Sequence, residues 1–377
     1  MASIPFGSRI GFLDSLRGYL SLLVILHHVA ITYGAEGGWY YKEHTSQPVV
    51  NLLLTTFCAF NQFYFMGLFF LLAGLFTPAS LNRKGNKIFF QERLTRLGIP
   101  LLCFGLIVSP PLEYFSEVYQ DGYNKGFFTY LIDHLPLINA FSPGPLWFVE
   151  TLLGFSLLYL LWAKWQPPIS PKINLQITPF QILLFSFLLA LLSFLVRFVY
   201  PIGALVWHLQ FAFFPQYILL FSLGIWLASP KALGQLPKHW LKPCMTIATV
   251  SILMVPALVI LNGRIDQRFL GGWHWQAIAL CLIEAAVCST ACIAVILIFR
   301  DWVPSKQKFW NLVGENSYGI FIVHAPICFF VAIALRSIDW YPLVKFAVVS
   351  TLSVGLSLFL SHTLRRLGGS VVRNVVG

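Results

Sequence analysis

Charged side chains are scarce in this sequence of 377 residues, of which Asp, Glu, Lys and Arg together make up 10%. Soluble domains carry roughly 25% charged residues, and 58% of this chain is hydrophobic, so the composition excludes an ordinary water-soluble globule. The seven cysteines form no CxxC pair and no metal-ligand spacing. Gly-rich phosphate loops, haem motifs, internal repeats and low-complexity tracts are also missing, and we expect no metal cofactor.

Long apolar runs dominate the sequence instead. Runs of about 20 apolar residues, the length needed to cross a bilayer, occur at 17–34, 51–77, 97–115, 144–163, 178–200, 205–228, 244–262, 273–299, 317–335 and 342–362. The connections are short except for 116–143, whose aromatic residues and SPGP indicate an interfacial helix and a turn. We therefore expect an all-α integral membrane protein with about ten transmembrane helices and short interfacial helices, forming one polytopic domain over residues 1–377.

The net charge of +11 is distributed unevenly along the chain. Ten helices would place both termini and every second loop on one side, and that side holds most of the Lys and Arg residues, including the basic loop around Lys87. Such a bias follows the positive-inside rule, which predicts cytoplasmic termini. The basic balance therefore indicates a lipid bilayer as the partner, rather than nucleic acid, and a multi-pass protein of the cytoplasmic (inner) membrane.

The first apolar run contains an arginine and two adjacent histidines, which are costly in hydrocarbon. Arg17 and His28 are separated by about 16 Å of helical rise and three turns plus about 20°, so they share one face, whereas His27 points about 100° away. Asp14 is placed to form an ion pair with Arg17. A packed histidine and a snorkelling arginine explain this spacing as well as a reactive pair does.

The segment FFQERLTRLGIP, residues 89–100, carries Arg93 and Arg96 at α-helical i, i+3 spacing. Two guanidinium groups on one face suit phosphate oxygens, because each donates paired hydrogen bonds. Anchoring to anionic lipid is the alternative, and this segment taken by itself favours it.

Further polar residues lie within the apolar runs. Glu150 follows Trp147 in PGPLWFVETLL, Glu284 lies deep in its run, and Tyr318 and His324 belong to SYGIFIVHAPI. If the run at 317–335 enters from the cytoplasm, His324 reaches a depth similar to that of His28. These residues indicate a polar cavity among the helices without defining its chemistry.

Five segments together resemble the acyltransferase-3 family of integral-membrane acyltransferases, especially its stand-alone type related to glucan-biosynthesis protein C. They are LDSLRGYLSLLVILHHVAITYG, FFLLAGLFTPAS, RLTRLGIPLL, GPLWFVETLLGFSLLY and NSYGIFIVHAPI. The first resembles the family's Arg-x10-His segment at Arg17 and His28. The second has Ala73 where serine is common, which removes a supporting hydroxyl.

The resemblance implies transfer of an acyl group, acetyl or succinyl, from cytoplasmic acyl-CoA to a hydroxyl of a carbohydrate outside the cytoplasmic membrane. In this interpretation His28 is the general base or a transient acyl carrier, a choice that the sequence leaves open. Arg17 contacts the CoA thioester arm or its phosphates, and Arg93 and Arg96 hold the nucleotide phosphates. The cavity candidates are Asp14, Trp147, Glu150, Glu284, Tyr318 and His324.

Two other classes of function remain open at this stage. A transporter or flippase for a small anion or a lipid-linked sugar would use intramembrane histidines and carboxylates in a proton relay. The sequence lacks the paired Gly/Pro-interrupted spans expected of many inverted-repeat transporters. A non-catalytic assembly partner in a polysaccharide pathway is the third interpretation. The acyl group, the acceptor and the oligomeric state are not defined by the sequence.

Overall fold

The computed structural model describes residues 11–43, 45–134, 141–171, 177–263, 266–303 and 307–369. The chain is 79% helical and has no strand among these residues, which confirms an all-α integral membrane protein. The longer helices are α1 (Gly11–Thr32), α2 (Pro48–Gln62), α3 (Phe65–Arg93), α7 (Trp147–Trp162), α8 (Pro179–Val199), α9 (Phe214–Leu227), α11 (Leu241–Asn262), α13 (Trp275–Asp301), α14 (Lys308–Ala334) and α15 (Pro342–Leu367). The shorter helices are α4 (Ile99–Cys103), α5 (Ser109–Ser116), α6 (Phe127–His134), α10 (Pro230–Leu233) and α12 (Gln267–Leu270).

The expected apolar runs all fall on helical segments. Eight helical stretches in the described part of the chain are long and apolar enough to cross a membrane. One of them, Pro48–Asp121, contains two of the expected runs, because the chain turns at Gly85, whose φ of 73° is accessible to glycine. The run expected at 205–228 is helical only over Phe211–Leu227, a shorter apolar segment.

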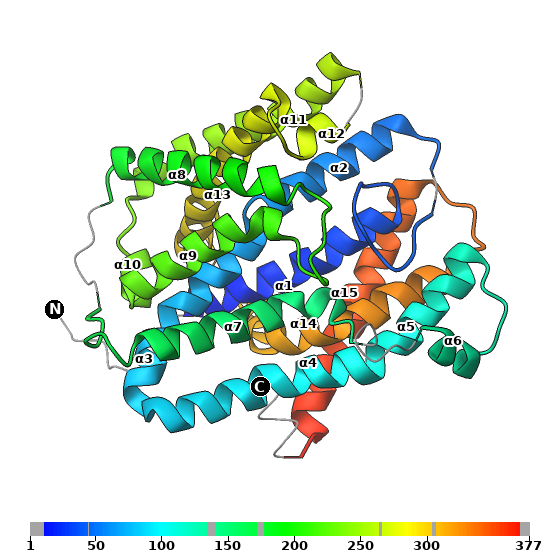
Figure 1. Ribbon diagram of the computed structural model, residues 1–377, viewed down its shortest axis with the longest axis horizontal. Helices are drawn as coiled ribbons and strands as arrows, with labels where there is room; N and C mark the ends of the chain where they lie inside the picture. Colours follow the sequence, from blue (N-terminus) through cyan, green and yellow to red (C-terminus); the bar gives the residue numbers. More distant parts are fainter. Residues whose placement is uncertain are drawn as a thin grey trace.

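Helix α1 lies at the centre of the bundle, with the other long helices packed around it (Figure 1). Its sequence explains this position, because apolar and small residues such as Leu16, Leu20, Ile25 and Ala30 are buried on every side of the helix. A helix that is hydrophobic all round is stable only when it is surrounded. Helices α8 and α11 are mostly exposed at the periphery and fit a lipid-facing position.

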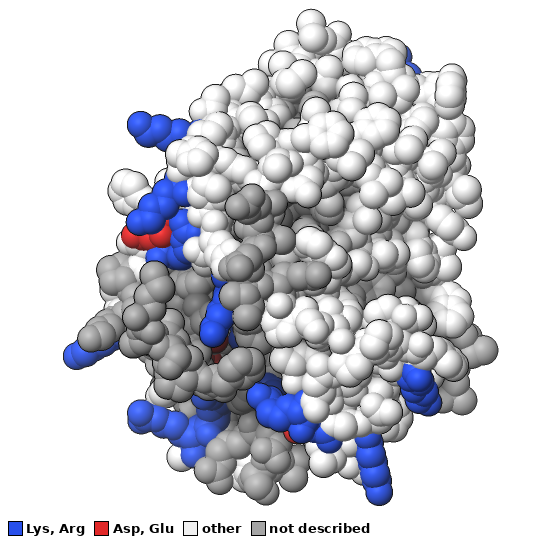
Figure 2. Space-filling model, turned by 90° about the vertical axis from the view of Figure 1, so that its left-hand side faces the viewer, with Lys and Arg blue, Asp and Glu red and all other residues white. Residues whose placement is uncertain are grey.

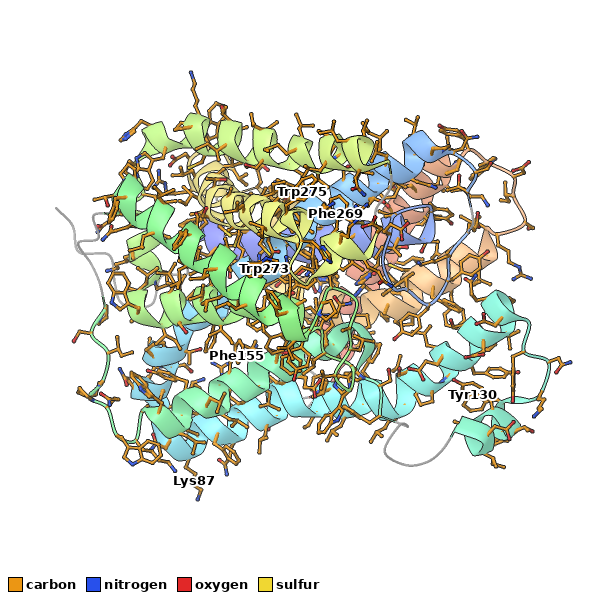
Figure 3. All side chains as sticks on the ribbon, turned by 45° about the horizontal axis from the view of Figure 1, so that its top comes forward. Lys87, Tyr130, Phe155, Phe269, Trp273 and Trp275 are labelled. Atoms are coloured by element: carbon orange, nitrogen blue, oxygen red, sulfur yellow. The ribbon has the colours of Figure 1, made fainter. Side chains whose placement is uncertain are left out.

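One end of the bundle is rich in basic side chains. Figure 2 looks onto the end that lies at the left of Figure 1, and Lys and Arg side chains lie over it with few acidic groups among them. Lys87 lies toward this end, whereas Tyr130 of α6 lies toward the opposite one (Figure 3). A basic end of this kind fits the positive-inside rule, from which cytoplasmic termini are predicted. The orientation of the protein in the membrane stays a prediction.

The long connection around 116–143 contains a short helix of the kind expected at an interface. In α6, Phe128 and Ile132 are exposed on one side, while Tyr130 is buried against Tyr114 and Tyr123. Exposed apolar groups on one face and ring packing on the other are typical of a helix that lies along a membrane surface. Residues 135–140 are outside the described part of the chain.

Candidate active site

Helices α1 and α14 run parallel and in register through the centre of the bundle. The hydroxyl of Ser21 donates to the carbonyl of Ser317, a separation of 296 residues. The same offset relates Gly18 to Gly314, whose backbones are so close that a Cβ on Gly18 would lie 2.9 Å from the Gly314 nitrogen. Small residues allow helix backbones to approach in this way within membranes.

This register brings His28 and His324 to the same level. Their rings lie nearly parallel, with centroids 5.4 Å apart and planes inclined by 14°. Each histidine is ten residues beyond its glycine, about 15 Å along its helix. The expected similarity in depth is therefore a direct contact, and α14 enters the bundle from the same end as α1.

Trp39, from the loop between α1 and α2, completes this group. Its ring stacks on His28 with centroids 3.8 Å apart and planes inclined by 14°, and it lies 6.3 Å from the His324 ring. We define His28, His324 and Trp39 as the histidine–tryptophan cluster. Trp39 was not predicted as a site residue, because it lies outside the apolar runs. The signal that could have found it is the aromatic triplet WYY soon after the first run.

Three polar atoms of the cluster have no hydrogen-bond partner in the protein. Nδ1 of His28, Nε2 of His324 and Nε1 of Trp39 are buried without a hydrogen bond. Nδ1 of His324 lies 2.6 Å from the carbonyl of Phe321, which only accepts, so this nitrogen donates and the neutral ring keeps a lone pair on Nε2. Leaving buried polar groups unpaired costs about 1–3 kcal/mol each, so such a cluster is unusual for a purely structural core.

His27 has a different environment from its neighbour. Its ring stacks on Phe65 of α3 with centroids 5.2 Å apart, and it meets the His28 ring edge-on. The side chain is buried, whereas that of His28 is only half-buried. The side chains of His27 and His28 point in different directions, as helical geometry predicts. His27 belongs to the packing between α1 and α3.

Arg17 lies toward the basic end of the same helix. Its Nη1 is 3.4 Å from Oδ1 of Asp14, as the spacing predicts, and its guanidinium lies 4.6 Å from the centroid of the Phe76 ring in α3. Phe76 belongs to a half-buried stripe of α3 with Phe69 and Ala73. Ala73 therefore shares a helix face with the residue that contacts Arg17.

The other two candidate arginines, Arg93 and Arg96, lie where α3 ends and a π-helical turn begins. Arg93 is the last residue of α3, with its guanidinium 4.8 Å from the Phe89 ring centroid, and Arg96 lies inside the π-helical turn η1 (Leu94–Gly98). The α-helical spacing assumed for the pair therefore ends at Arg93. Turns of this type occur frequently at functional sites.

Tyr318 joins this segment to α14. Its hydroxyl donates to the carbonyl of Arg96 at 2.5 Å, six residues before His324 on the same helix. Arg96 itself is exposed and Arg93 is half-buried. The arginine segment is thus fixed to the helix that carries the second histidine.

Two of the remaining candidates lie toward the other end of the bundle. Glu150 in the first turn of α7 pairs with His208, with Oε2 and Nε2 2.6 Å apart. Trp147, one turn earlier, packs on Tyr217 of α9 with ring centroids 5.3 Å apart. Glu150 is thus paired with His208, and Trp147 belongs to the packing between α7 and α9.

Glu284 is engaged in a closed ion pair. Its Oε2 accepts from Nη2 of Arg197 in α8, and both side chains are fully buried, at 0% exposure. The same guanidinium also contacts the sulfur of Cys281 at 3.3 Å and lies over the ring of Phe213. This arrangement joins α8 to α13 and pairs one oxygen of the buried carboxylate with a buried cation, while Oε1 of Glu284 has no hydrogen-bond partner in the protein.

A metal site would need several His, Cys, Asp or Glu side chains close together. Within the described residues no group of three or more His, Cys, Asp or Glu side chains is placed to hold a metal ion. All seven cysteines are free thiols, and Cys281, Cys288 and Cys292 are buried in α13.

The protein belongs to a defined class of membrane enzymes. A family model described as an acyltransferase domain, that of the acyltransferase-3 family, matches residues 10–362, so the chain belongs to this family. The predicted acyltransferase class is confirmed.

More specific relatives match a part of the chain. Glucans biosynthesis protein C from Salmonella paratyphi B, Salmonella heidelberg and Salmonella enteritidis is in each case 33% identical over 121 residues, which are 31% of this chain. The matched part spans 30% of the length of these relatives. No solved structure matches the chain.

Proposed function

We propose that this protein transfers an acyl group, acetyl or succinyl, from cytoplasmic acyl-CoA to a hydroxyl of an extracytoplasmic carbohydrate. The chain would act as one polytopic domain in the cytoplasmic membrane, with both termini inside. Membership of the acyltransferase family supports the reaction class. The name of the partial relatives supports a glucan or related glycan as the acceptor.

The single observation that carries the proposal is the histidine–tryptophan cluster. It contains three buried polar atoms without partners in the middle of an apolar bundle. A hydroxyl oxygen is a suitable partner for such a group, because it donates to one nitrogen and accepts from another. The cluster also contains the imidazole of His28, a group that can take a proton from a hydroxyl and pass it on during the transfer.

The transfer balances with these groups. As the carbohydrate oxygen attacks the thioester carbonyl, its proton passes to the imidazole of His28. The C–O bond forms, the C–S bond breaks, and the proton ends on the CoA thiol. If His28 carries the acyl group instead, its nitrogen attacks the thioester first and the hydroxyl then takes the acyl group from it. Both sequences give the same products.

The arginines suit the donor end of the site. Arg17 is one helix turn from Asp14 and lies about 16 Å from His28 along α1, toward the basic end of the bundle. Arg93 and Arg96 lie in the segment tied to α14 by Tyr318. We propose that Arg93 and Arg96 bind the CoA phosphates and that Arg17 contacts its thioester arm, because guanidinium groups pair well with phosphate oxygens.

The test is an assay with membrane vesicles that have acyl-labelled CoA on the cytoplasmic side of the membrane and gluco-oligosaccharides on the other side. Label in the oligosaccharide together with stoichiometric free CoA thiol supports acyl transfer. Movement of the sugar across the membrane without CoA consumption supports the transporter alternative and contradicts the proposal. Acid quenching before acceptor is added distinguishes the two routes, since only the nucleophilic route leaves label on the protein.

A further inference from the structure

The loop between α1 and α2, described over residues 33–43 and 45–47, lies directly beyond the histidines. Helix α1 ends at Thr32, four residues after His28, and the chain then returns so that Trp39 covers the His28 ring. This loop is at the end of the bundle opposite the arginine segment, on the side from which the proposed acceptor would arrive.

The position of Trp39 is held by contacts from several elements. Nζ of Lys345 in α15, which is only 5% exposed, lies 2.7 Å from Oε2 of Glu43. The hydroxyl of Ser116 donates to the carbonyl of Tyr40, and the backbone nitrogen of Lys42 donates to Oε1 of Gln120 at 2.8 Å. Side chains from α5, η3 (Glu117–Asp121) and α15 therefore fix the loop, and the stacked indole is part of a rigid wall.

The indole N–H is the feature that packing does not explain. Buried tryptophan nitrogens usually find an acceptor, yet Nε1 of Trp39 has none in the protein. The unpartnered nitrogens of His28 and His324 belong to the rings beside it. The donor and the imidazole nitrogens belong to stacked rings, and a single hydroxyl group can both accept from an N–H and donate to a ring nitrogen.

We infer that Trp39 is a substrate-contacting residue whose indole N–H donates to the acceptor hydroxyl while the imidazole of His28 takes that hydroxyl's proton. This inference rests on the proposed acyl transfer and adds the residue that orients the carbohydrate acceptor. The indole face packs on the His28 ring, and the N–H binds one lone pair of the hydroxyl oxygen. The other lone pair stays free to attack the acyl carbon as the proton leaves. The oxygen gains the acyl group, and Trp39 keeps its proton throughout.

The decisive variant is Trp39→Phe, because phenylalanine keeps a flat ring for stacking and removes only the N–H donor. With gluco-oligosaccharide as the acceptor probe, we expect kcat/KM for the acceptor to fall roughly tenfold, the worth of one hydrogen bond. The KM for acyl-CoA should not change. Trp39→Leu, which also removes the stacked ring, should lower kcat further.

Trp273→Phe is the matched control. Trp273 is 77% exposed and packs on Phe194 and Phe198 of α8. This variant should retain wild-type kinetics. Equal losses in both tryptophan variants, or a Trp39→Phe enzyme with wild-type acceptor kinetics, would overturn the donor role. A matched rise in the KM values of both substrates would indicate a structural role and overturn it as well.

A binding measurement separates this inference from the reaction itself. The gluco-oligosaccharide probe should raise the melting temperature of detergent-solubilised His28→Ala protein, and the shift should be lost when Trp39→Phe is added. If this Trp39-dependent shift occurs while the wild-type protein shows no acyl transfer, the proposed reaction fails and the acceptor contact stands. Absence of any shift in the His28→Ala protein overturns the assignment of Trp39 to this class of acceptor.

Discussion

His28 and His324 face each other ring to ring, 5.4 Å apart, from two parallel helices that are in register over at least ten residues. Two imidazoles at one level of an apolar bundle form an uncommon arrangement, because intramembrane ionisable groups are costly and usually have functional roles. The contact follows from the close approach at Gly18 and Gly314, so helix packing at the basic end sets the geometry of the cluster some 15 Å away.

Replacing each of the two adjacent histidines by alanine, one at a time, tests the assignment of His28. His28→Ala should lower acyl transfer by about 10²–10⁴-fold, the usual contribution of a general acid–base group. His27→Ala should keep most of the activity, since its ring packs on Phe65. Initial rates with labelled acyl-CoA, at matched protein levels in the membrane, measure both. The reverse pattern of activities would show that the wrong histidine has been assigned.

Arg93 provides a test of the donor end. Removing a charge-assisted hydrogen bond to phosphate costs about 1.5–3 kcal/mol, so Arg93→Ala should raise the KM for acyl-CoA by roughly 10- to 150-fold with little change in acceptor KM. Lys87→Ala is the control, because Lys87 is exposed at the same end and can attract anionic lipid as well.

The lipid-anchor alternative makes the opposite prediction for these two variants. Under that alternative both substitutions weaken activity alike in vesicles that contain anionic lipid, and neither substitution changes activity in vesicles of neutral lipid. A KM for acyl-CoA that is the same in Arg93→Ala and in the wild type would remove Arg93 from the donor site.

Glu284 is expected to matter for stability rather than for substrate. Removing one member of a buried ion pair costs about 3–5 kcal/mol, because the other charge stays buried and unpaired. Glu284→Gln should therefore lower the melting temperature of the solubilised protein. The double variant Arg197→Met, Glu284→Leu should recover much of the loss, because both charges are removed together. Activity per folded molecule in this double variant should stay close to wild type; a specific loss of kcat there would return Glu284 to the substrate site.

Sequence reasoning succeeded where a relationship is local or follows from the order of the spans. The Arg17–Asp14 contact depends only on i, i+3 spacing, and the shared depth of His28 and His324 depends on two helices entering from one end. The all-α membrane class followed from composition, because no other structure satisfies the backbone of so many apolar runs in lipid.

Contacts between residues far apart in the sequence could not be predicted in the same way. The pairing of Glu284 with Arg197 joins residues far apart in the sequence, and no periodicity specifies which helices become neighbours. Trp39 lies in an irregular loop, whose path depends on anchors such as the Glu43–Lys345 ion pair. The π-helical turn at Leu94–Gly98 also departs from the regular α-helix on which the Arg93–Arg96 spacing was based.

The close approach of α1 and α14 leads to the last prediction. A Cβ on Gly314 would lie 2.5 Å from the carbonyl oxygen of Asp14, which is backbone and has no free rotamer to move away. Gly314→Ala should therefore push the two helices apart, at a cost of about 1–3 kcal/mol typical of overpacking, and should separate the histidine rings. We expect lower thermal stability and a loss of kcat that exceeds the loss of folded protein. Gly154→Ala in α7 is the matched control, because a Cβ there meets no atom within 4 Å. It should stabilise the protein by roughly 0.5–1 kcal/mol, the usual gain on replacing glycine within a helix, and leave acyl transfer unchanged. A Gly314→Ala protein with wild-type stability and kcat would show that the register of these helices does not set the geometry of the cluster.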